Sequence, residues 1–109
     1  MSEPMTAPKD ASSDAPRADF EILYEDDETR ITRWRFDPGA QTGWHHHAVD
    51  YVTIQESGGE LRLERDDGSV THVEYEPGRT VRYAAPIKHN ATNVSDEEVR
   101  VTEIEYKTG

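Results

Sequence analysis

Three histidines have residue types and spacing that could hold a metal ion: His45 and His47, and the distant His89. On a β-strand, residues i and i+2 point to the same face and lie about 6.6 Å apart along the strand. Both imidazoles of the first pair could therefore reach one ion, and a third imidazole from another strand would complete a site. Neutral imidazole binds zinc, iron, nickel and copper, so the ligands leave the identity of the metal open.

The two remaining histidines have no such spacing. His46 lies between two candidate ligands, so we expect it to point the opposite way, toward solvent or a second sheet. His72 stands alone beside Val73 and Tyr75, whose apolar character predicts that the histidine faces outward at the surface. A site with three protein ligands keeps at least one coordination position open, which distinguishes catalytic metal sites from closed structural ones.

The segments that must position these histidines read as short strands. Alternating apolar residues predict strands at 28–36, 59–65, 70–76 and 99–106, and turn signals stand at 66–69 and 76–78. No segment has a helical period, and nothing repeats at a fixed long interval. Short strands separated by Gly, Pro and Asp turns predict an all-β sandwich or barrel.

The length of 109 residues allows one domain. Residues 1–18 contain almost no apolar side chains, so we expect a disordered tail and a folded domain at 19–109. About ninety residues bury only a small core. Pairing with a second copy would bury more apolar surface, and we therefore expect a homodimer.

The charge and composition exclude several functions. The chain has 23 acidic and 12 basic residues, a formal charge of −11, so we expect neither nucleic acid nor an anionic membrane as a partner. It has no cysteine, which excludes disulfides and thiol catalysis. No apolar run has the length of a signal peptide or a membrane span, and we expect a cytoplasmic protein.

Both histidine segments resemble motifs of the cupin superfamily. The first motif is matched by Gly39, His45, His47 and Gly58, and the second by Gly78, His89 and Asn93, with Ala84 and Pro86 replacing its Pro and Gly. Over about residues 28–107 the chain is most similar to small bacterial cupins of the BauB type, the β-alanine degradation proteins. The resemblance implies a single-domain RmlC-like jelly-roll barrel in which His45, His47 and His89 hold a divalent metal.

The sequence departs from the first motif at its glutamate. Tyr51 occupies that position, and the neighbouring Asp50 has the wrong strand parity to replace the carboxylate. The phenol of Tyr51 could donate a hydrogen bond or relay a proton to a bound substrate, which makes it the candidate catalytic residue. It could equally be an aromatic ring that fills the space of the missing glutamate.

Other polar and aromatic residues have less specific roles. We expect Trp34 and Trp44 in the core or the wall of a pocket, and Asn93 in structural hydrogen bonds of a turn. Gln41 and Arg82 could offer polar contacts in a pocket, although Arg82 could equally be exposed because it alternates with apolar neighbours.

These residues favour a metal-dependent enzyme that acts on a small organic metabolite. The metal, which could be iron, zinc, nickel or copper, would polarise a substrate oxygen or activate water or dioxygen, and an oxygenase-type reaction in amino-acid or β-alanine catabolism is one concrete version. The alternative is a non-catalytic module that binds or senses a small molecule, with or without metal. A third hypothesis is a degenerate structural cupin whose partner protein carries the chemistry.

Overall fold

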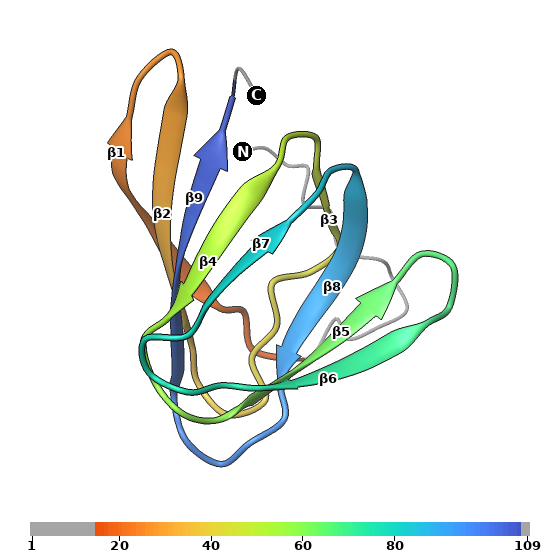
Figure 1. Ribbon diagram of the computed structural model, residues 1–109. Coiled ribbons are helices and arrows are strands. Elements are labelled where there is room, and N and C mark those ends of the chain that lie inside the picture. The colour runs from red at the N-terminus through yellow and green to blue at the C-terminus, as the bar shows by residue number, and fades with distance from the viewer. Residues whose placement is uncertain (1–14, 108–109) are drawn as a thin grey trace.

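Nine strands form two antiparallel sheets in the computed structural model, which describes residues 15–107 (Figure 1). The first sheet has the order β1 (Asp19–Glu25), β2 (Thr29–Phe36), β9 (Val99–Tyr106), β4 (Tyr51–Gln55) and β7 (Thr80–Tyr83). The second has the order β3 (His45–His47), β8 (Ile87–Asn93), β5 (Glu60–Arg65) and β6 (Val70–Glu74). The described residues contain no helix, and the predicted all-β jelly roll is confirmed.

The core lies between the two sheets and follows the alternation of each strand. In β5 Leu61 and Leu63 are buried, whereas the residues between and after them are only half-buried. Facing them from the first sheet are Phe36, Val99 and Val101, all at most 3% exposed. Each such side chain stabilises the fold by about 1.5–3 kcal/mol through burial. This packing fixes the separation of the two sheets and therefore the width of any space between them.

The four strand ranges predicted from the sequence agree with β2, β5, β6 and β9 to within two residues at each end. The structure adds five strands to these, namely β1, β3, β4, β7 and β8. Strand β7 matters for the site because it pairs with β4 and places Tyr83 directly opposite Tyr51.

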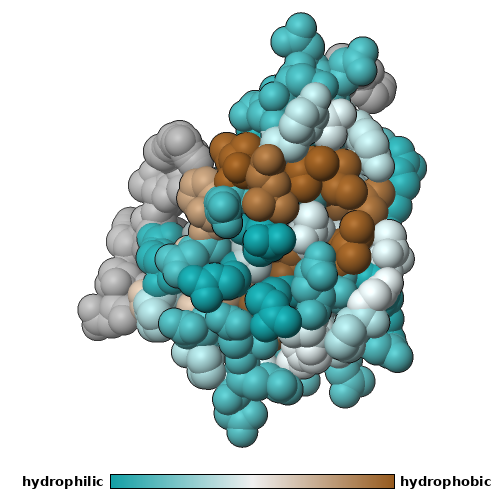
Figure 2. All heavy atoms as spheres, turned by 90° about the vertical axis from the view of Figure 1, so that its left-hand side faces the viewer, coloured by the Kyte–Doolittle hydropathy of each residue, from teal (hydrophilic) through white to brown (hydrophobic). Residues whose placement is uncertain are grey.

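Strand β1 forms one edge of the first sheet and carries exposed apolar side chains. Phe20, Ile22, Leu23 and Tyr24 are all at least 40% exposed. The pairing register with β2 shifts between Ile22 and Tyr24, so Leu23 lies in a bulge. Figure 2, which shows the side of the molecule that bears β1, displays apolar residues gathered into one band.

The chain before β1 contacts the rest of the fold. Residues 1–14 lie outside the described residues, so the predicted disordered tail stays a prediction there. Within residues 15–18, the Ala18 amide donates to the Gln41 carbonyl at 2.9 Å, and the Gln41 amide donates to the Pro16 carbonyl at 3.0 Å. The Arg17 guanidinium donates to the Thr42 carbonyl at 3.1 Å. These contacts begin before the expected domain start at residue 19.

Asn93, at the end of β8, joins three segments through its side chain. Its Nδ2 donates to the carbonyls of Phe36 and Glu97 at 3.1 and 2.8 Å. Its Oδ1 accepts from the Ser95 amide at 2.9 Å. The expected structural role of this residue is confirmed. Within residues 15–107 no helix is long and apolar enough to cross a membrane.

Candidate metal centre

The imidazoles of His45, His47 and His89 converge between the two sheets. Strands β3 and β8 pair so that His45 lies directly opposite His89, and His47 follows two residues later on the same face. The Nε2 atom of His45 lies 3.0 Å from Nε2 of His47 and 3.1 Å from Nε2 of His89. Imidazoles that share one ion through bonds of about 2.1 Å have nitrogens about 3.0 to 3.4 Å apart. The spacing therefore fits a single metal ion.

The turn before β3 sets the direction of this strand. Gly43 has a φ of 85°, which side chains other than glycine rarely tolerate. Its amide donates to the Asn90 side-chain oxygen at 2.9 Å, and the Asn90 amide group donates to Gln41 Oε1 at 2.8 Å. Gln41 and Asn90 are both buried. Their contacts hold the start of β3 against β8, where His45 and His47 face the interior and His46 is exposed.

The partners of two Nδ1 atoms fix the tautomers of the rings. His45 Nδ1 lies 3.0 Å from the Gly43 carbonyl oxygen, and His47 Nδ1 lies 3.5 Å from Oε2 of Glu105. Both partners are acceptors, so in a neutral ring Nδ1 carries the proton and Nε2 the lone pair. Two lone pairs 3.0 Å apart repel each other unless a cation lies between them. The donor set therefore fits a divalent transition metal.

Burial keeps two of these rings neutral. It is the largest cause that lowers the pKa of His45, to about 4, and that of His89 further still. Nearby histidines add to the effect, since His47 lowers the pKa of His45, and His45 that of His89. Metal binding requires the neutral ring, so these shifts leave His45 and His89 ready to bind an ion at neutral pH.

A carboxylate of β9 reaches the site. The position in β4 where the sequence motif has a glutamate is occupied by Tyr51 instead. Glu105 lies directly opposite Tyr51 in the pairing of β4 with β9. The imidazole of His47 is the largest cause that lowers the pKa of Glu105, and Arg30 contributes from 3.4 Å. The sequence interpretation did not name Glu105 as a site residue. The alternation of Val101, Glu103 and Glu105 along the last strand was the available signal.

Tyr51 is buried against the site. Its ring is 2% exposed and stacks on His47, with centroids 4.1 Å apart, and on Tyr83, with centroids 5.2 Å apart. Burial is the largest cause that raises the pKa of Tyr51, so the phenol stays protonated and can act only as a neutral group. The ring does fill the space at the glutamate position. Its catalytic role stays a prediction.

His45 and His89 form one wall of a pocket between the sheets, which has a cavity volume of about 40 Å³ and is partly open to solvent. Glu103 lines it as well, and its Oε1 accepts a hydrogen bond from Trp34 Nε1 at 3.3 Å. The sequence interpretation did not assign Glu103 to the site. The lining residues are Trp34, Phe36, Thr42, His45, Tyr51, Thr53, Leu61, Leu63, Tyr75, Tyr83, His89, Ala91, Val101 and Glu103.

Other residues considered from the sequence lie elsewhere. Arg82 is exposed and pairs with Asp50 at 2.8 Å, so neither provides a group to the pocket. His46 is exposed, and His72 is exposed and contacts Glu60 at 2.7 Å. The outward direction predicted for both histidines is confirmed. Trp34 lines the pocket as expected, whereas the half-buried Trp44 is not among the lining residues.

Comparisons with known proteins agree with this architecture. Residues 32–105 match the family described as the Cupin domain. The β-alanine degradation protein BauB of Pseudomonas aeruginosa is 37% identical over 95 residues, which cover 87% of this chain and 99% of that protein. A crystal structure of a cupin domain from Bordetella pertussis superposes with a TM-score of 0.82 at 33% identity and covers 88% of this chain and 99% of that one.

A more distant structure supports the fold alone. A conserved protein from Klebsiella pneumoniae with a double-stranded β-helix domain has a TM-score of 0.71 at 19% identity, and the match covers 89% of this chain and 81% of that one. The family match spans more than half of the chain, and the BauB match spans most of both proteins. The chain is a small cupin and belongs to the cupin domain family, with BauB among its similar relatives.

Proposed function

We propose that this cupin binds one divalent transition metal through His45, His47 and His89 and is an enzyme that acts on a small organic metabolite. The observation that carries the proposal is the convergence of three Nε2 atoms, two of them on rings whose Nδ1 faces an acceptor. Iron, zinc, nickel and copper all accept imidazole nitrogens. Bound there, the metal would act as a Lewis acid toward a substrate oxygen or activate water or dioxygen.

The residues around the histidines would bind and orient the substrate. The apolar wall of Leu61, Leu63 and Ala91 excludes water from one side of the pocket. Tyr51 lies against His47 as a protonated phenol, so it could donate a hydrogen bond to a substrate oxygen next to the metal. Replacement by phenylalanine removes only this donor and keeps the ring.

The relatives support a role in the breakdown of a small amino acid. BauB is named for β-alanine degradation, and its identity to this chain extends over nearly its whole length. An oxygenase-type reaction on β-alanine or a compound derived from it is the concrete version we propose. A cytoplasmic location fits such a role.

A non-catalytic binding or sensing module is the second candidate. The observation that favours it is Tyr51, which stands where the cupin motif has a carboxylate and stacks on a candidate ligand instead of offering it an anion. Such a module would bind the metabolite in the same pocket without turnover.

Oxygen consumption separates the two candidates. Iron-loaded protein, prepared without oxygen, is mixed with air-saturated buffer and β-alanine or other small carboxylates or thiols, and an electrode records oxygen uptake. The enzyme proposal expects uptake that depends on the added compound and is absent from His89→Ala. Ligand binding by calorimetry without any uptake would contradict the oxygenase version of the enzyme and favour the binding module.

We also propose that two copies associate through β1. The strand has one unpaired edge among the described residues, and two identical edges can pair around a twofold axis. Arg33 and Arg35 face Glu21 and Asp19 of the same chain at 4.0 and 3.4 Å, so local charges are balanced despite the net charge. A second copy would cover the apolar side chains that β1 exposes (Figure 2).

Light scattering after size exclusion tests the dimer. Wild-type chain and Val70→Glu, which adds a charge at an exposed site of β6, should both have the mass of two chains. Ile22→Glu should have the mass of one chain. A monomeric wild type, or a dimeric Ile22→Glu, would refute association through β1.

A further inference from the structure

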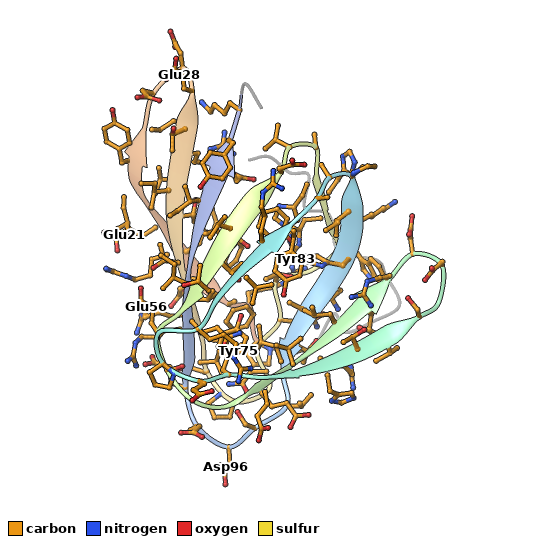
Figure 3. All side chains as sticks on the ribbon, viewed as in Figure 1. Glu21, Glu28, Glu56, Tyr75, Tyr83 and Asp96 are labelled. Carbon is orange, nitrogen blue, oxygen red and sulfur yellow. The ribbon has the colours of Figure 1, made fainter. Side chains whose placement is uncertain are left out.

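One wall of the pocket, formed by the first sheet, carries a single carboxylate among aromatic rings. Glu103 lies opposite Thr32 of β2 and Thr53 of β4, so its side chain leaves the middle of the sheet and faces the interior. The lining here also includes Trp34, Tyr75 and Tyr83. Figure 3 shows the two tyrosine side chains in the space between the sheets.

The carboxylate of Glu103 has one neutral donor and no cationic partner in the described part of the chain. Trp34 Nε1 donates to its Oε1 at 3.3 Å. None of the ion pairs found within residues 15–107 includes Glu103, whereas its neighbour Glu105 has Arg30 at 3.4 Å. Burial raises the pKa of Glu103, and the imidazole of His47 lowers it. A half-buried carboxylate without an ion-pair partner gains from a cation that enters the pocket.

The surrounding rings favour the same kind of ligand. The faces of tryptophan and tyrosine attract a cation through their ring quadrupoles. Tyr51 and Tyr83 stack at 5.2 Å, and the charge of Glu103 is among the causes that raise the pKa of both Tyr51 and Tyr75. Both phenols and the carboxylate of Glu103 line the same pocket.

We propose that Glu103 and these aromatic residues bind the protonated amine of a small metabolite, whose oxygen-bearing end lies toward His45 and His89. The two histidines and Glu103 line the same pocket, so both ends of a short molecule would lie in one space. The assignment of the oxygen-bearing end rests on the function proposed above. The amine subsite itself depends only on Glu103 and its neighbours.

Two probes of similar size test the two ends separately by calorimetry: propylamine has only the amine, and propionate has only the carboxylate. Propylamine is titrated into metal-free, full-length protein, because its nitrogen could otherwise bind a metal. We expect it to bind, and 1-propanol, its neutral analogue, to bind at least about tenfold more weakly.

The Glu103→Gln variant keeps the shape of the side chain and removes its charge. It should weaken propylamine binding by about tenfold to a hundredfold and leave propionate binding to the metal-loaded protein unchanged. Glu74→Gln, the same change on the exposed part of β6, is the matched control and should bind like wild type. The comparison of propylamine with 1-propanol on wild type needs no variant. It therefore still tests the amine subsite if Glu103→Gln fails to fold.

The results separate the amine subsite from the proposed metal function. Equal affinity of wild type for propylamine and 1-propanol, or equal affinity of wild type and Glu103→Gln for propylamine, would overturn the amine subsite. A chain that takes up no metal but binds propylamine through Glu103 would contradict the proposed metal function and support the subsite. A chain that binds metal and propionate but not propylamine would contradict the amine subsite and support the proposed metal function.

Discussion

Removal of the charge of Glu105 should weaken metal binding although this residue is not a ligand. Its Oε2 lies 3.5 Å from His47 Nδ1, where it holds the proton that keeps Nε2 free for the metal. Loss of such a contact usually reduces metal affinity by about 10- to 100-fold. The distance is long and glutamine can still accept a hydrogen bond, so we expect the lower end for Glu105→Gln, about tenfold or about 1.4 kcal/mol.

The fold should tolerate this change. Arg30, which faces Glu105 at 3.4 Å, keeps its partner Glu25 at 3.1 Å. Competition with a coloured chelator for zinc at pH 7 gives the dissociation constants of wild type, Glu105→Gln and the surface control Glu74→Gln. In a His47→Ala background, Glu105→Gln should cause no further loss, because the ring it orients is gone. An unchanged zinc dissociation constant for Glu105→Gln would refute the role of Glu105. An equal loss of zinc affinity from Glu105→Gln in the His47→Ala background would refute it as well.

Three further predictions concern turnover and stability. Tyr51→Phe should keep the zinc dissociation constant of wild type in the chelator assay and lose any oxygen uptake, because only the phenol donor is removed. The metal-free protein should lose stability as pH falls from 6.5 toward 4 in thermal melts, because the pKa of His45 and of His89 is lowered on folding and the unfolded chain binds protons first; a melting temperature that is constant over this range would contradict those shifts. Asn93→Ala should lower the free energy of unfolding in urea by about 2–4 kcal/mol, because it removes the amide donor to the carbonyls of Phe36 and Glu97 and the acceptor of the Ser95 amide; a loss below about 0.5 kcal/mol would show that other groups replace it.

Local patterns in the sequence were sufficient for the all-β fold and for the pair His45 and His47, whereas the jelly roll came from the resemblance to the cupin motifs. Strand alternation at Leu61 and Leu63 predicts the buried face of β5, and the i, i+2 spacing of His45 and His47 predicts a common direction. Both patterns involve residues that are two positions apart in the sequence, so they can be recognised before the fold is known. The cupin motifs added the pairing with His89, which spacing alone could not supply.

The carboxylates of β9 could not be assigned in the same way. Glu103 and Glu105 alternate with apolar residues, but a charged residue at such a position usually faces solvent. Only the pairing of β9 with both β2 and β4 places them inside, because a central strand of the sheet has one face toward the core. Strand β1 was missed for a related reason: its apolar side chains lie at an exposed edge, next to a segment of low complexity.

Metal content is the most direct test of the proposed site. Protein purified without an affinity tag is analysed by elemental mass spectrometry, wild type beside His47→Ala, both with circular dichroism to confirm the fold. We expect about one equivalent of a single transition metal in wild type and almost none in the variant. No metal in wild type, even after incubation with iron, zinc, nickel and copper, or equal metal in both proteins, would contradict the proposed site.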